Sequence, residues 1–308
     1  MAVIELHPDV EDYILELPLA EIEARGGVAD LIEEGKVVIV RDLRLGLDFE
    51  ALEQLGKSTD AVTDSDVRRQ LKKLESTAFF EGERPRRWSR KPVFDDPVRQ
   101  ALFDIICNGD SRLFDRAAQT LRQAHDEAVR IFNLCFAGYE PFRLIPSVRL
   151  TQTLFENLHW DEHWIEEDFH TARVFANLDR RPRIWHLSHR FPEMMKLLYR
   201  DHDLARFAGK DPNELLHYIN SMVLGGLSEK WKESLPKHRI AFDPGEIWLA
   251  ESRLVSHQIY YGEAALVYMW LVSFESMADQ DNRFNRQVEK VHQEMRLAAK
   301  VPSGAARG

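Results

Sequence analysis

The sequence contains little cysteine. Among its 308 residues only Cys107 and Cys135 carry a thiol, and two cysteines cannot build the disulfide framework of a small secreted domain. Both lie in apolar segments that are typical of helix, where a free thiol usually behaves as a small buried hydrophobic group. We therefore expect a reducing, cytoplasmic environment for this chain.

Long apolar runs are missing as well. No stretch approaches the roughly 20 apolar residues that a membrane-spanning helix requires. The first 17 residues contain five carboxylates and lack the basic and apolar regions of a secretory signal peptide. The sequence thus predicts a cytoplasmic protein without a transmembrane segment.

The sequence contains fewer basic than acidic residues. The chain has 41 Lys and Arg against 51 Asp and Glu, a formal net charge of −10. Nonspecific binding to nucleic acid relies on clustered cations that neutralise phosphates, so nucleic acid is excluded as the expected partner. The only strongly basic patch, residues 84–91, is interpreted as a solvated loop or as the rim at which a lipid-linked anionic substrate would make peripheral contact.

Two patterns of apolar side chains divide the chain. Residues 111–136 carry apolar side chains at three- and four-residue steps, which predicts a long amphipathic helix. After this helix, short β-rich runs bounded by Pro or Gly predict strands. These expected strands cover residues 142–154, 171–178, 183–187, 239–242, 246–251 and 264–274. Six short strands favour a barrel or a sandwich.

We interpret the chain as a single domain, residues 1–308, of the α+β class with a mainly β core. Residues 1–138 are expected to form an α-rich N-terminal layer. Residues 139–276 form the core, with a helical insertion at about residues 190–235. Residues 277–300 form a charged C-terminal helix. The arrangement of histidines in the core, described next, favours a double-stranded β-helix, also called a jelly-roll or cupin-like barrel.

The first half of the candidate site is the pair His159 and Asp161. On a strand, residues i and i+2 point to the same face, so an imidazole and a carboxylate would enter the barrel together. They supply two ligands of the 2-His-1-carboxylate facial triad that binds Fe(II). A His-x-Asp tripeptide alone is a weak signal, because it also arises by chance.

His257 supplies the second half. Pro244 and Gly245 predict a tight turn into an apolar strand, and His257 stands at the start of the next β-rich run. This arrangement closes a double-stranded β-helix and returns a distal histidine to the metal. His159, Asp161 and His257 are thus the expected Fe(II) ligands, with positions left open for a co-substrate and dioxygen (O2). Related radical halogenases replace the carboxylate with a small residue, so Asp161 favours hydroxylation over halogenation.

Other histidines compete for the role of ligand. His163 stands four residues after His159 and would share a helix face with it in a zinc site, but no Glu follows His159 directly, as the metalloprotease motif requires. His170, His186 and His189 also lie nearby, and we interpret the last two as ordinary polar groups. A cupin-like metal-binding protein or a zinc hydrolase therefore stays an alternative.

An oxygenase of this type also needs a cation for the far carboxylate of 2-oxoglutarate. Many families place an Arg about ten residues after the distal His, but residues 262–270 contain neither Arg nor Lys. The first candidate is Arg173, twelve residues after Asp161 in an otherwise apolar run, because an unpaired charge there is costly. Arg183 and Arg149 are the second candidates.

The order of these segments resembles the Kdo hydroxylases, which are Fe(II)- and 2-oxoglutarate-dependent dioxygenases that hydroxylate the sugar acid Kdo of lipopolysaccharide. The similarity runs from about residue 138 to residue 274. The segments that carry it are 142–147, 158–161, 172–178, 182–185 and 255–257 with Gly262. The resemblance implies a double-stranded β-helix, iron bound by His159, Asp161 and His257, and a co-substrate bound by a strand arginine matching Arg173.

Two departures from that family concern the substrate. The stretch between Arg149 and His159 is short and lacks a basic, Trp-containing insertion, and Asp161 is followed by Glu-His-Trp. Since one fold serves many substrates, the expected substrate is a Kdo-like sugar acid or another small polar molecule. An amino acid or a small metabolite of a biosynthetic pathway is the alternative, which the acidic chain favours.

Overall fold

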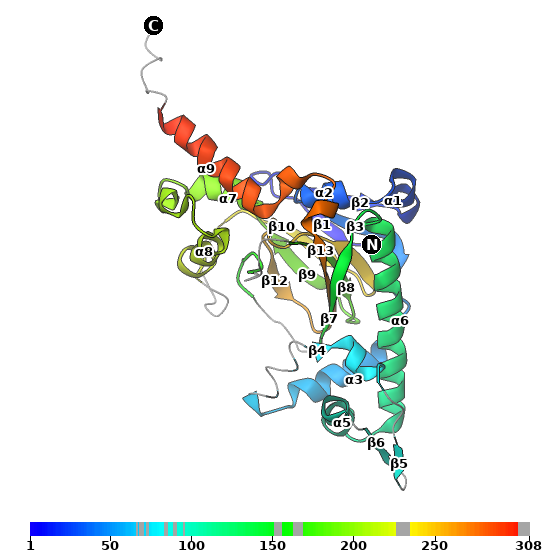
Figure 1. Cartoon of the computed structure of the whole chain (residues 1–308). Helices are drawn as coiled ribbons and strands as arrows, with labels where there is room; N and C mark the ends of the chain where they lie inside the picture. Colours follow the sequence, from blue (N-terminus) through cyan, green and yellow to red (C-terminus); the bar gives the residue numbers. More distant parts are fainter. Residues whose placement is uncertain are drawn as a thin grey trace.

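Two β-sheets form the centre of the molecule, and helices lie around them (Figure 1). This mixed α and β architecture with large sheets agrees with the sequence-based expectation. The computed structural model describes residues 1–65, 67, 71, 74–82, 86–88, 91–94, 96–150, 156–162, 169–225 and 235–300.

The larger sheet has seven strands in the order β2-β3-β11-β8-β13-β7-β4. Adjacent strands of this sheet are antiparallel, except for β2 and β3, which are parallel. The strands are β2 (Ile14–Leu17), β3 (Val37–Arg44), β4 (Leu74–Glu75), β7 (Pro141–Arg149), β8 (Phe169–Asn177), β11 (Glu246–Leu249) and β13 (Ala265–Ser273). Almost every residue of β8 is buried, because this central strand is covered on both faces.

The smaller sheet has the order β1-β10-β9-β12, all antiparallel. Its strands are β1 (Val3–Glu5), β9 (Arg183–Leu187), β10 (His238–Phe242) and β12 (Gln258–Tyr261). An aromatic core joins the two sheets: Phe175 and Trp248 of the larger sheet pack with Trp185 and Phe242 of the smaller one. The two sheets therefore enclose a common interior.

The N-terminal region contributes strands as well as helices. It adds β1 to the smaller sheet and β2, β3 and β4 to the larger one, so residues 1–138 are part of both sheets and not only a helical layer. Val37, Val38, Ile39 and Val40 are almost completely buried. Pairing of β3 with β11 explains this burial, since it places the β-branched run between two neighbours inside the sheet.

Helices of the first half cover the outer face of the larger sheet. The long helix α6 (Ser111–Cys135) buries its apolar stripe against β8 and β13, as its periodicity predicts; Phe132, for example, stacks on Trp270. Figure 1 shows α6 running along one side of the molecule. The other elements of this region are α1 (Leu19–Arg25), α2 (Ala29–Glu33), α3 (Phe49–Asp60), α5 (Pro97–Ala101) and the hairpin strands β5 (Arg86–Trp88) and β6 (Lys91–Val93).

The basic patch predicted at residues 84–91 lies outside the residues whose side chains the structure describes. Contact of this patch with a lipid-linked substrate stays a prediction. None of the described helices is both long and apolar enough to cross a membrane.

Three helices of the second half build a separate core beside the sheets. They are α7 (Phe191–Leu198), α8 (Pro212–Tyr218) and α9 (Phe284–Lys300). Their apolar side chains pack around Trp160 and Leu254. Helix α9 begins at Phe284 and not at residue 277, because short 3-10 turns cover Phe274–Ser276 and Gln280–Asn282.

A buried carboxylate ties the segment before α9 to the N-terminal region. Glu33 of α2 is fully buried and accepts hydrogen bonds from the Tyr139 hydroxyl (2.7 Å) and from the backbone N–H groups of Ala278 and Asp279 (2.8 Å each). Three donors satisfy a carboxylate that would otherwise be costly to bury. Glu33 therefore fixes the start of the C-terminal segment.

Candidate metal centre

Two short segments bring the predicted ligands together. His159 and His257 form an isolated antiparallel bridge, in which the His159 N–H donates to the His257 carbonyl (3.1 Å) and the His257 N–H donates to the His159 carbonyl (2.9 Å). Directly opposed residues of an antiparallel pair carry their side chains on the same face. The imidazole rings accordingly lie with their centroids 4.4 Å apart.

Asp161 completes the group from the same face. Its backbone N–H donates to the Ser252 carbonyl (2.9 Å), which continues the pairing of the two segments. One carboxylate oxygen lies 3.7 Å from Nε2 of His159 and 3.9 Å from Nε2 of His257. Within the described part of the chain, these three side chains are the only His, Cys, Asp and Glu group whose ligand atoms lie close enough, within 4.8 Å of one another, to hold one ion.

Hydrogen bonds to the backbone fix the orientation of the imidazoles. Nδ1–H of His159 donates to the Asn157 carbonyl (2.7 Å) and Nδ1–H of His257 to the Val255 carbonyl (3.4 Å). This leaves the lone pair at Nε2 of each ring directed to the shared position. Burial and the neighbouring His159 lower the pKa of His257 to about 3, so its ring is neutral and ready to act as a ligand.

Aromatic side chains support this geometry from behind. Trp185 of β9 stacks on His257 with a centroid distance of 5.0 Å. Trp160, between the two proximal ligands, is fully buried; its indole N–H donates to the Leu254 carbonyl (3.3 Å), and its backbone is held by the amide of Asn220. Trp160 is therefore an anchor of the ligand segment and does not face a substrate.

Arg173 lies next to the metal ligands. It is buried, its β8 register places it opposite Met269 of β13, and its Nη1 donates to the second carboxylate oxygen of Asp161. A guanidinium carries five donors in a fixed plane. The structure thus brings the first candidate for co-substrate binding to the metal ligands.

Neither of the two other candidate arginines pairs with Asp161 within the described residues. Arg183 is buried at the start of β9 and makes no hydrogen bond or ion pair within the described residues. Burial and the nearby Arg149 lower its pKa to about 10. Gly262 leaves it room, since a Cβ there would lie 2.2 Å from Nη1 of Arg183. Arg149 is half-buried and pairs with Glu156 at 3.5 Å.

The competing histidines do not join this group. His170 lies on the opposite side of β8, where Nδ1 is 3.9 Å from a carboxylate oxygen of Glu251. His186 interacts through Nδ1 with the side chain of Gln258 (3.0 Å). His189 contributes its carbonyl to Ser256. His163 falls outside the described residues, so the zinc alternative that depends on it stays a prediction.

Sequence reasoning missed one polar pair beside the site. The Thr171 hydroxyl donates to the buried carboxylate of Glu251. Thr171 shares its β8 face with Arg173, two residues away, and Glu251 directly precedes Ser252, the backbone partner of Asp161. The sequence contained one signal for this pair: Glu251 is a charged residue at the end of the apolar run 246–251.

The chain is similar in fold to solved structures. No family model and no curated protein matches the sequence. Among solved structures, the apo form of the Kdo hydroxylase KdoO, a non-haem Fe(II) α-ketoglutarate-dependent dioxygenase, is similar with a TM-score of 0.59 at 15% identity, covering 92% of this chain and 96% of that chain. The same hydroxylase with succinate and Fe(III) gives a TM-score of 0.60 at equal identity and coverage. Its complex with α-ketoglutarate and Fe(III) gives a TM-score of 0.59, again at 15% identity and with the same coverage of the two chains. The predicted resemblance to the Kdo hydroxylases is thereby confirmed at the level of the fold.

Proposed function

We propose that the protein is a non-haem Fe(II)- and 2-oxoglutarate-dependent dioxygenase that hydroxylates a C–H bond of a small polar substrate. The observation that carries this proposal is the convergence of His159, Asp161 and His257 on one position. Two imidazoles and one carboxylate are the donor set of Fe(II) oxygenases. The two sheets around a common interior support the double-stranded β-helix predicted for the core.

The three side chains suit the ion in charge and tautomer. Two neutral imidazoles and one carboxylate carry a single negative charge, and each Nδ1 is already engaged with a backbone carbonyl. When bound, the iron supplies the oxygen activation that couples oxidation of 2-oxoglutarate to hydroxylation of the substrate. The protein orients both molecules and excludes water from the site.

Arg173 is the proposed partner of the far carboxylate of 2-oxoglutarate. It is the buried cation in contact with the ligand set, and a guanidinium binds a carboxylate through two parallel hydrogen bonds. Its ion pair with Asp161 also orients that carboxylate. Arg183 and Arg149 stay the second candidates for this role.

The substrate class follows the resemblance: a sugar acid such as Kdo, or an amino acid or other small metabolite. The similar solved structures favour a sugar acid, because they are structures of a Kdo hydroxylase. The net charge of −10 favours a free, small substrate, because an acidic protein repels a multiply anionic lipid.

The test is anaerobic addition of Fe(II) and 2-oxoglutarate to the metal-free protein. We expect the visible metal-to-ligand charge-transfer absorption of a chelated α-keto acid, followed by succinate formation when air is admitted. Both signals should vanish in His159→Ala and Asp161→Ala. A protein that binds zinc tightly and forms neither the absorption band nor succinate would instead support the hydrolase or cupin-like alternative.

A further inference from the structure

The chain segment that carries His159 and Asp161 is hydrogen-bonded on one side to the segment of the distal ligand. His159 exchanges main-chain hydrogen bonds with His257, and the Asp161 N–H donates to the Ser252 carbonyl. Trp160 lies between the two proximal ligands. In an extended chain the N–H and carbonyl groups of successive residues point to opposite sides, so those of Trp160 face away from His257. They need partners of their own, because Trp160 is fully buried.

The side chain of Asn220 provides these partners. Its Oδ1 accepts a hydrogen bond from the Trp160 N–H (3.1 Å), and its Nδ2 donates to the Trp160 carbonyl (2.8 Å). A carboxamide carries the same donor and acceptor as a peptide group, so Asn220 bonds to Trp160 as a third strand would. Asn220 is only 6% exposed. Loss of this pair would leave buried main-chain groups unsatisfied, which is costly.

Asn220 lies in an irregular turn of the helical insertion. Helix α8 continues into a π-helical turn, Ile219–Val223, in which the Leu224 N–H donates to the Ile219 carbonyl (3.0 Å). This hydrogen bond spans one residue more than that of an α-helix, and such turns occur frequently at functional sites. Ile219 packs in the same apolar core as Trp160. The turn is therefore anchored directly beside the ligand segment.

The insertion also holds the residue that follows Asp161. One carboxylate oxygen of Glu162 accepts a hydrogen bond from Nδ2 of Asn220 (3.0 Å), and the other lies 2.9 Å from Nδ1 of His217. His217 and Asn220 are three residues apart, so they are neighbours on the helix surface. Trp160 and Glu162, on the two sides of Asp161, are therefore bound by α8 and its π-helical turn.

The contact with Trp160 affects how the two proximal ligands face each other. The peptide groups on either side of Trp160 connect the Cα atoms of His159 and Asp161, so rotation of either group turns one ligand relative to the other. Asn220 is bonded to both peptide groups. Removal of a group that orients a metal ligand typically weakens metal binding by about 10- to 100-fold.

We propose that Asn220 is a positioning residue of the metal centre, whose carboxamide fixes both peptide groups between His159 and Asp161. It acts through the main chain of Trp160 and is not itself a ligand. The helical insertion thereby contributes to metal affinity. The inference rests on the proposed function, because it takes His159 and Asp161 as ligands of the iron.

The test is Co(II) binding to the full-length, metal-free protein. Co(II) accepts the imidazole and carboxylate donors that bind Fe(II), and its visible absorption reports how the donors are arranged. Asn220→Leu keeps the approximate volume of the side chain and removes both hydrogen bonds. We expect this variant to bind Co(II) at least about tenfold more weakly and to change the shape of the absorption. Asn220→Gln keeps the carboxamide and should restore part of the affinity.

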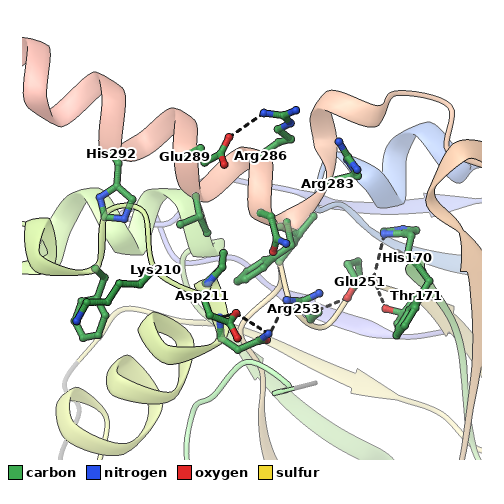
Figure 2. A pocket seen from close by; sticks show the side chains of 18 of the residues that line it. His170, Thr171, Lys210, Asp211, Glu251, Arg253, Arg283, Arg286, Glu289 and His292 are labelled. Carbon is green, nitrogen blue, oxygen red and sulfur yellow. Dashed lines mark hydrogen bonds and ion pairs between the residues drawn. The ribbon is translucent and has the colours of Figure 1, made fainter. Parts of the chain in front are cut away.

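Asn213→Leu is the matched control on the same helix. Asn213 is almost as buried as Asn220, at 7% exposed, but its amide bonds to the side chains of Arg253 (3.2 Å) and Asp211 (3.0 Å). Figure 2 shows these two partners in the wall of a cavity beside α9. Asn213→Leu should lower the midpoint of urea denaturation much as Asn220→Leu does, and should leave the Co(II) affinity unchanged.

Two results would overturn the proposal. The first is a Co(II) affinity and absorption of Asn220→Leu equal to those of the wild type. The second is an equal loss of affinity in Asn213→Leu, which would show that metal binding follows the stability of α8 alone. If leucine prevents folding, Asn220→Ser takes its place with the same expectation, because the smaller side chain removes the paired hydrogen bonds without adding bulk.

The wild-type protein separates this inference from the proposed function. If it binds no Co(II) and gives no absorption band with Fe(II) and 2-oxoglutarate, the ligand assignment fails and the inference fails with it. If the band forms and Asn220→Leu binds Co(II) as tightly as the wild type, the role of Asn220 is refuted and the proposed function stands.

Discussion

Arg173 donates a hydrogen bond to the same carboxylate, Asp161, that lies between the two histidines of the candidate metal centre. The strand β8 thus delivers a buried cation to a carboxylate of a separate segment. A charge-assisted hydrogen bond therefore joins the two segments inside the protein. The proposed role of Arg173 in binding 2-oxoglutarate rests on this contact with the candidate metal ligands.

Replacement of Arg173 should separate co-substrate binding from metal binding. Arg173→Ala is expected to raise the dissociation constant of 2-oxoglutarate by more than about tenfold, since a charge-assisted pair is lost. Binding of Fe(II) in the absence of 2-oxoglutarate should change much less. Calorimetry with each component tests this, and Arg173→Lys is the control that keeps the charge. Equal losses for both components would contradict the assignment.

Loss of any ligand should abolish metal binding without unfolding the chain. His159→Ala, Asp161→Ala and His257→Ala are each expected to weaken Fe(II) at least about 100-fold, because each removes one of three donors. The control is His186→Ala, which removes a histidine on β9 outside the group. Metal content after dialysis and the circular dichroism of each variant provide the measurement. Retention of iron by a ligand variant would show that another residue takes its place.

The buried guanidinium of Arg183 should lower the stability of the ligand-free protein. Its buried guanidinium has no partner among the described residues, and exchange of buried charge for an apolar side chain of similar volume is often stabilising by about 1–4 kcal/mol. We expect Arg183→Met to raise the melting temperature by about 2–6 °C. Saturating 2-oxoglutarate should stabilise wild type and variant equally. If 2-oxoglutarate stabilises only the wild type, Arg183 and not Arg173 binds the far carboxylate.

Glu33 should be one of the most sensitive positions outside the site. Glu33→Gln replaces an acceptor oxygen with an amide that faces the N–H donors of Ala278 and Asp279. A loss of about 2–4 kcal/mol in the free energy of unfolding is expected, because buried donors lose their partner. Urea denaturation measures it, with the exposed neighbour in Glu34→Gln as the control. A loss no larger than in that control would show that the contact is dispensable.

Acid should destabilise the metal-free protein partly through His170. Burial lowers the pKa of His170 below its ordinary value, although Glu251 and Glu33 oppose the shift. Between the lowered pKa and the ordinary one near 6.5, the unfolded chain binds a proton that the folded chain does not. Stability is therefore present above about pH 6.5 and falls as the pH decreases toward the lowered pKa.

The variant His170→Asn should flatten this pH dependence. Unfolding would then take up at most about one proton fewer, which reduces the slope by up to about 1.4 kcal/mol per pH unit. Urea denaturation at several pH values between 7 and 5, with a chelator present, provides the slope. A partly exposed histidine, changed in His202→Asn, is the control. An unchanged slope in the His170 variant would exclude His170 as a source of acid sensitivity.

Patterns within one segment were readable from the sequence. The strand at Arg183–Leu187 and the long helix Ser111–Cys135 lie where periodicity predicts them, because burial of one face repeats along each element. Spacing also predicted the candidate ligands His159, Asp161 and His257, whose side chains converge in the structure. The Pro-Gly turn before Glu246 correctly predicted the strand β11 that follows it.

Features that depend on distant partners were not readable. The strands Val3–Glu5 and Ile14–Leu17 are short and half exposed, and only pairing with β10 and β3 makes them strands. The C-terminal helix was predicted from residue 277, but it begins at Phe284, after 3-10 turns at Phe274–Ser276 and Gln280–Asn282. The contact between Thr171 and Glu251 joins residues far apart in the chain, and neither is unusual in its own segment.

The bridge between His159 and His257 is made entirely by the main chain, as is the contact from Asp161 to Ser252. The positions of the three side chains are thus set by groups that every residue type except proline possesses. Exchange of any of these three side chains, other than for proline, therefore leaves the donors and acceptors of this frame in place.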